Sequence, residues 1–215
     1  MKKIIMSDVL NQKFQNILST QYTILTVIEK RFSVLKFIYD EYQNDNKGTF
    51  NSFIIETMHV YRKSIIIDLC KLYITPNLNP KAKDIYKGNS QNNNFYFTIY
   101  TYKNELDVFF YVIDDILSSL VNEVKLISQE RDKELAHKDS STGTSVRMYL
   151  KNIAEIEILV YKAREIVEIL YKSKGAGIDK IDFQNNSLKK IINFLKVDKE
   201  TEYESLISKF KNKDN

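Results

Sequence analysis

One arginine and one histidine stand six residues apart in the stretch QERDKELAHKD, which covers residues 129–139. Arg131 carries a planar guanidinium that can bind a phosphate through two parallel N–H groups. His137 can accept or release a proton near neutral pH. RNA contains its own nucleophile, the 2′-hydroxyl, so a protein that cuts RNA needs only to move protons and to stabilise charge on the phosphate. These two residue types are sufficient for that chemistry.

The same stretch also has a purely structural interpretation. Arginines at helix ends often pair with neighbouring carboxylates, and Glu130, Asp132 and Asp139 are all close in sequence. A histidine near the C-terminus of a helix is favoured by the negative end of the helix dipole. The residue types alone therefore leave both a solvated helix end and a catalytic site open.

Four long segments with apolar residues at helical spacing predict the elements that position this stretch. The expected helices cover about residues 7–42, 51–73, 103–130 and 146–171. The low content of glycine (5) and proline (2) favours long helices over short strands. We expect an all-α fold, with an antiparallel bundle of about four long helices in residues 1–172. Residues 173–215 are expected to form a linker and short C-terminal helices as an appendage.

Three shorter segments have competing interpretations. Residues 75–97 lack a long periodic stripe and are expected to form a surface excursion. The basic run Tyr61–Lys63 is interpreted as solvated surface in preference to a phosphate contact. The aromatic run Phe95–Lys103 is interpreted as helix packing in preference to a platform for stacked bases.

Helical geometry makes Arg131 an unusual residue. At 100° per residue, the apolar stripe of the third expected helix passes from Val124 and Ile127 directly onto Arg131. A guanidinium on that face is costly unless an anion or a hydrogen-bond network meets it. His137 would lie about 120° around the same helix, so one straight helix does not bring the two side chains together. Either the helix bends or ends between them, or a second copy of the chain supplies the partner across a two-fold axis.

Composition limits the compartment and the cofactors. The single cysteine, Cys70, excludes an internal disulfide and fits a reducing cytoplasm. No stretch of about 18 apolar residues is present, so no membrane partner is expected. The net charge of +4 is too small to indicate nucleic-acid binding by itself. His59 lies eleven residues from Cys70 without a second histidine nearby, so we expect no metal site and no cofactor.

The stretch RDKELAHKD resembles the motif of the HEPN superfamily, in which an arginine and a polar residue are followed after four to six residues by a histidine. It is most similar to the AbiU-type abortive-infection branch, where R-[ND]-K-x-x-A-H-x-D is common. The order of expected helices agrees, because the motif closes the third long helix and another long helix follows. The resemblance covers about residues 7–171.

This resemblance implies a metal-independent endoribonuclease of a phage-defence or toxin–antitoxin system, with Arg131 and His137 lining a cleft in a homodimer. The implied partners are RNA, a second copy of the chain, and an antitoxin or another defence-system protein. We assign supporting roles to Asp132, which would orient Arg131, and to Asp139, which would hold His137. The alternative is a non-catalytic HEPN-like helical dimer that binds RNA or a partner protein.

One departure from the family concerns regulation. HEPN toxins that are paired with a minimal nucleotidyltransferase antitoxin often carry a tyrosine two residues after the histidine, and that tyrosine is adenylylated. Asp139 occupies this position here. We therefore do not expect regulation by that route.

Overall fold

The computed structural model describes residues 2–44, 52–74, 93–136, 153–179, 183, 187–193, 201 and 204. Every regular element among them is a helix, so the expected all-α class is confirmed. The elements are α1 (Lys2–Gln43), α2 (Ser52–Tyr73), α4 (Phe95–Thr101), α5 (Lys103–Leu106), α6 (Val108–Ser119), α7 (Val121–Ala136) and α9 (Ile153–Lys172). No helix within these ranges is long and apolar enough to cross a membrane.

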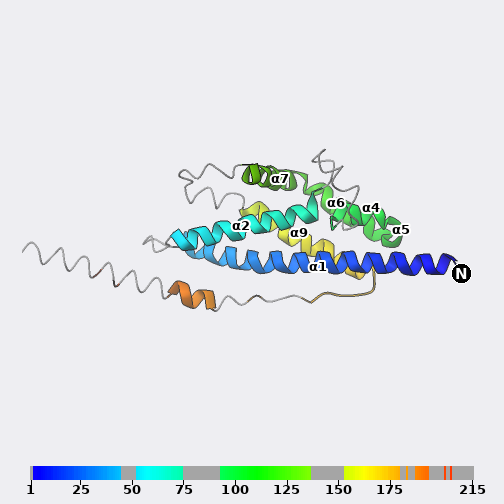
Figure 1. Cartoon of the computed structure of the whole chain (residues 1–215), viewed down its shortest axis with the longest axis horizontal. Helices are drawn as coiled ribbons and strands as arrows, with labels where there is room; N and C mark the ends of the chain where they lie inside the picture. Colours follow the sequence, from blue (N-terminus) through cyan, green and yellow to red (C-terminus); the bar gives the residue numbers. More distant parts are fainter. Residues whose placement is uncertain are drawn as a thin grey trace, which may run out of the picture.

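The long helices lie along one another around a common core (Figure 1). The longest helix, α1, packs against α2 and α9, while α7 packs on α2 and α9. The expected helix over residues 146–171 has apolar residues at helical spacing, and those within α9 form a buried seam that faces other helices. Its buried members are Ile153, Ile156, Val160, Ala163, Val167 and Leu170.

The expected continuous helix over residues 103–130 was wrong, because the structure divides it into α5, α6 and α7. Asp107 separates α5 from α6 with φ 50 and ψ −120, a conformation that L-residues rarely adopt. Leu120 separates α6 from α7, and its N–H donates to the Leu117 carbonyl at 3.2 Å, in a turn tighter than an α-helix. The buried stripe continues through both interruptions, which explains why the sequence pattern did not reveal them.

Most of the excursion expected over residues 75–97 lies outside the described residues, and its C-terminal end was wrong, because α4 begins at Phe95. Asn94 caps this helix, since its Oδ1 accepts hydrogen bonds from two backbone N–H groups of the first turn. The Asn94 side-chain amide also donates to the Ile74 carbonyl at the end of α2. Buried Gln21 of α1 donates to the Thr98 hydroxyl at 2.9 Å and so fixes α4 against α1.

The C-terminal appendage begins with a turn at Gly175, whose φ of 70 is readily adopted by glycine. Residues 187–193 form part of a short helix, which was expected from the sequence. Leu188 and Ile192 are four residues apart on one face of this helix and pack against the hydrophobic core. The division between bundle and appendage at residue 172 stays a prediction.

Candidate functional site

Helix α7 carries the first part of the stretch RDKELAHKD (residues 131–139), which we call the HEPN-like stretch because of its resemblance to that motif. It positions Arg131 and Asp132 on its last turns. The Arg131 side chain is 20% exposed, between the core and open solvent. Its Nε and Nη2 donate to the same Asp132 oxygen, Oδ1, at 3.0 and 2.7 Å. The contact expected between these two side chains is therefore present, whereas its role in orienting Arg131 for chemistry stays a prediction.

His137 and Asp139 lie outside the described residues. The pairing of Arg131 with His137, and that of Asp139 with His137, therefore stay predictions. Figure 1 places α7 at the edge of the bundle, against α2. The described part of the site is accordingly an arginine on the outer part of an interhelical interface.

A buried ion pair lies directly beside Arg131. The Arg62 side chain of α2 is only 1% exposed, and its Nη2 donates to Oε1 of Glu130, the residue before Arg131. The second oxygen of that carboxylate, Oε2, is buried and accepts no hydrogen bond within the described part of the chain. Because a buried charge pair gains little net free energy unless every polar atom is satisfied, we infer that this pair mainly fixes how α7 lies on α2.

The sequence interpretation of Tyr61–Lys63 as solvated surface was wrong for Arg62. Arg62 follows Met58 by four residues and precedes Ile65 by three, and both of these apolar side chains are fully buried. The helical spacing therefore placed a basic residue on the inward face of α2. That placement was a usable signal, since a buried arginine requires a carboxylate from a neighbouring helix.

Cys70 lies on the same interface between α2 and α7. Its Sγ is 3.9 Å from the Ile127 carbonyl oxygen of α7. Burial raises the pKa of the Cys70 thiol to about 12, while the nearby charge of Arg131 acts in the opposite direction. The thiol is therefore protonated at neutral pH and is not an activated nucleophile.

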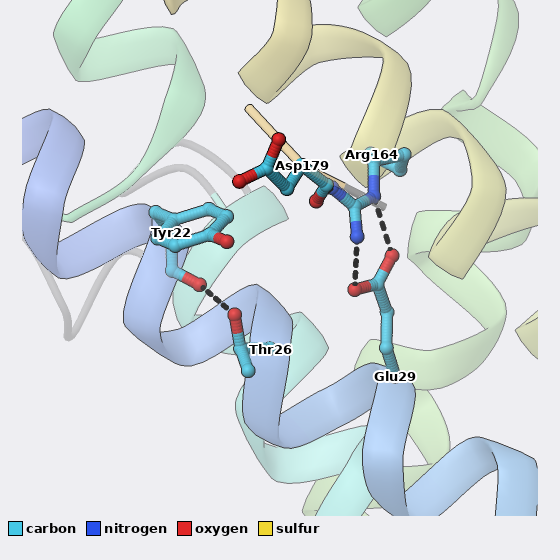
Figure 2. Close-up of polar contacts among 5 residues, drawn as sticks. All are labelled: Tyr22, Thr26, Glu29, Arg164 and Asp179. Carbon is cyan, nitrogen blue, oxygen red and sulfur yellow. Dashed lines mark hydrogen bonds and ion pairs between the residues drawn. The ribbon is translucent and has the colours of Figure 1, made fainter. Parts of the chain in front are cut away.

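A second interhelical arginine–glutamate pair joins α1 to α9 (Figure 2). Nε and Nη2 of Arg164 donate to the two different oxygens of Glu29, each at 2.7 Å. Nη1 of the same guanidinium donates to the Asp179 carbonyl at 3.3 Å, which holds the segment after α9 against the bundle. Glu29 also lines an open groove of about 530 Å³ between α1, α9 and Phe183.

Neither the comparisons nor the side-chain clusters add a further assignment to this site. No protein-family profile, curated protein or solved structure matches the chain. Within the ranges that the structure describes, no group of three or more histidine, cysteine, aspartate or glutamate side chains is arranged to hold a metal ion. The functional interpretation therefore rests on the HEPN-like stretch and on the surroundings of Arg131.

Proposed function

We propose that this protein is a metal-independent endoribonuclease of a phage-defence or toxin–antitoxin system, acting on RNA in the cytoplasm. The observation that carries the proposal is the stretch RDKELAHKD, which begins on the last turns of α7 in an all-α fold. The partial exposure of Arg131 supports it, because a phosphate could reach the guanidinium.

In the proposed reaction His137 accepts the proton of the RNA 2′-hydroxyl, whose oxygen attacks the adjacent phosphorus. The bond to the 5′-oxygen breaks, and that oxygen receives a proton from a protonated histidine. The products are a 2′,3′-cyclic phosphate and a 5′-hydroxyl. Arg131 donates to the non-bridging oxygens and stabilises their growing negative charge.

A homodimer would supply both histidine protonation states in one cleft. Each chain carries one HEPN-like histidine, His137, and a two-fold axis near the end of α7 would place two copies around one phosphate. Exchange of wild-type subunits with excess His137→Ala subunits should then suppress cleavage by more than simple dilution. Activity that stays strictly proportional to the wild-type subunits, after verified exchange, would contradict the shared cleft.

The direct test is cleavage of a single-stranded RNA in excess chelator, with the product ends identified by mass spectrometry. Wild-type protein should cut the RNA and leave 2′,3′-cyclic phosphate ends. His137→Ala and Arg131→Ala should abolish cleavage, whereas the control Lys125→Ala, an exposed basic residue on the same helix, should retain it. Cleavage that vanishes with chelator and returns with magnesium would refute the mechanism.

The second candidate is a non-catalytic helical dimer that binds RNA or a partner protein. One observation favours it: Arg131 is paired within its own chain with Asp132. In a non-catalytic scaffold, Arg131 would only have to form an ion pair at the end of its helix. RNA binding that persists without any cleavage, and that is unchanged in His137→Ala, would favour this candidate over the enzyme.

A further inference from the structure

The first turns of helix α6 carry apolar residues on two opposite faces. Its inner face is buried and consists of Phe110, Ile113, Ile116 and Leu117. Its outer face carries Val108, Tyr111 and Val112, which are all exposed and occupy positions i, i+3 and i+4. A cluster of large apolar side chains exposed on a protein surface often marks a place where another molecule binds. The outer face of α6 therefore indicates a surface that another molecule covers.

The neighbouring helix α4 extends this surface. Tyr100 contacts the Phe110 ring edge-to-face at 5.3 Å, and Phe110 contacts Tyr111 in the same way at 5.2 Å. Phe97 lies one turn before Tyr100 on α4 and is also exposed. We call Phe97, Tyr100, Val108, Tyr111 and Val112 the α4–α6 patch. The sequence expectation that the aromatic run serves packing holds for Phe95 and Tyr102, which are buried, whereas Phe97 and Tyr100 are largely exposed.

The segment that carries the α4–α6 patch is acidic, although the whole chain has a formal charge of +4. Residues 95–120 contain four carboxylates and a single basic residue, Lys103. Lys103 lies over the Phe110 ring at 4.3 Å from its centre. The carboxylates, which we call the acidic rim, are Glu105, Asp107, Asp114 and Asp115. An acidic rim repels RNA phosphates, so these exposed aromatic residues do not suit a base-stacking surface.

The backbone at the edge of the patch is strained. Asp107 has a φ of 50 and a ψ of −120 and directly precedes Val108. Such conformations are unfavourable for L-residues and persist where the surrounding structure imposes them, often at binding sites. The turn at Asp107 starts α6 at a new angle. It thereby sets where Val108 and Tyr111 emerge next to Tyr100.

We propose that the α4–α6 patch is a docking surface for a basic amphipathic segment of another protein, whose apolar side chains cover Tyr100, Val108 and Tyr111 and whose lysines or arginines meet the acidic rim. Exposed tyrosines surrounded by charged groups are typical anchors of protein interfaces. Opposite charge at the rim selects the partner and accelerates its association. This surface belongs to α4 and α6 and does not depend on the function proposed for Arg131.

The test uses the full chain and two synthetic amphipathic helical peptides with the same apolar face. One peptide carries lysines along both flanks and the other carries glutamates. Fluorescence anisotropy should show that the lysine peptide binds at least about tenfold more tightly than the glutamate peptide. Tyr111→Ala and Val108→Ser should each weaken binding of the lysine peptide by about tenfold or more.

Two matched variants control for exposure and residue type. Tyr161 on α9 is 65% exposed, compared with 62% for Tyr111, and Val60 on α2 is 63% exposed, compared with 62% for Val108. Tyr161→Ala and Val60→Ser should bind the lysine peptide like the wild type. Equal effects of patch and control variants, equal binding of both peptides, or no binding of the lysine peptide would each overturn the proposal. Sedimentation that shows self-association lost only in the patch variants would assign the surface to a second copy and would also overturn it.

Discussion

Within the described ranges, two arginine–glutamate pairs join helices, and they satisfy their carboxylates to different extents. Between α1 and α9, Arg164 engages both oxygens of Glu29 at 2.7 Å (Figure 2). Between α2 and α7, Arg62 engages Oε1 of Glu130, while Oε2 is buried without a hydrogen bond from the described residues. The Arg164 side chain is 12% exposed and that of Arg62 is 1% exposed.

This difference separates a structural contact from a candidate functional one. A pair with two parallel hydrogen bonds at the edge of a groove is well satisfied and fits the role of joining two helices. A buried carboxylate oxygen without a hydrogen bond, such as Oε2 of Glu130, has a free-energy cost, and such groups require an explanation. The pair of Arg62 and Glu130 adjoins Arg131, so we infer that its cost is tolerated because it holds α7 in the register that presents Arg131.

The largest effect is expected at Arg62. Arg62→Ala leaves Glu130, whose Oε2 is buried, without its cation and should lower the free energy of unfolding by about 3–5 kcal/mol, measured by urea denaturation. Adding Glu130→Gln to this variant should recover part of the loss, because the unpaired charge is then removed. A double variant as unstable as Arg62→Ala alone would show that lost packing, and not the charge, is the cause.

A smaller effect is expected at Arg164. Glu29 lines the open groove, so water can solvate its carboxylate once the arginine is gone. Arg164→Ala should therefore lower the free energy of unfolding by about 1–2 kcal/mol. The control is Lys162→Ala on the same helix, whose ion pair with Glu165 is more exposed and should contribute less than about 0.5 kcal/mol. A loss at Arg164 as large as that at Arg62 would remove the distinction between the two pairs.

The burial of Cys70 in the α2–α7 interface should also make the free energy of unfolding depend on pH in the alkaline range. Burial raises the folded-state pKa of Cys70 from an ordinary 9.0 to about 12. Its contribution to stability is therefore fully present below pH 9 and is lost as the pH rises toward 12, because the unfolded thiol ionises first. The slope from this one group approaches about 1.4 kcal/mol per pH unit.

Urea denaturation between pH 8 and pH 11 tests this by comparing the wild type with Cys70→Ala, which should lose stability less steeply. A constant offset from the smaller side chain does not affect the comparison, since only the slopes are used. Tyr73 also has a pKa raised well above its usual value by burial, and it remains in both proteins. Parallel slopes would show that the thiol is solvated in the folded state.

The smallest effect on stability is expected at Asp132. Its contact with Arg131 involves neighbouring residues and a mostly exposed carboxylate, so Asp132→Asn should change the free energy of unfolding by less than about 0.5 kcal/mol. If Asp132 orients Arg131 for catalysis, kcat for RNA cleavage should fall several-fold with little change in KM. Asp40→Asn, which alters a similarly exposed pair with Lys36, should change neither quantity. Unchanged kcat in Asp132→Asn would leave the contact as a helix-end ion pair.

The sequence predicted those features that depend on local spacing. The buried seam of α9 follows from its alternation of apolar residues, because each side chain position is set by helical geometry alone. The contact of Arg131 with Asp132 could also be predicted from the sequence, since the two residues are adjacent. The inward position of Arg62 could have been recognised from its spacing to Met58 and Ile65.

Other features depend on residues distant in sequence. The partner of Arg62 is 68 residues away, and spacing within α2 does not identify it. The turn at Asp107 has no local signal, since aspartate there replaces the glycine that such a φ usually selects. It arises because Leu106 and Phe110 are both buried on either side of the junction. Tertiary packing, and not local preference, therefore divides the third helical segment.

The hydrogen bond from Asn94 to the Ile74 carbonyl joins two points of the chain that are 20 residues apart. Asn94 also caps α4, so one side chain contacts both the end of α2 and the start of α4. For a closed loop, each doubling of length costs only about 0.6 kcal/mol of closure entropy. Between these two residues the chain can therefore gain or lose sequence in evolution at little cost to the bundle. The same property makes this position suitable for inserting a fluorescent or affinity tag while α2 and α4 stay folded.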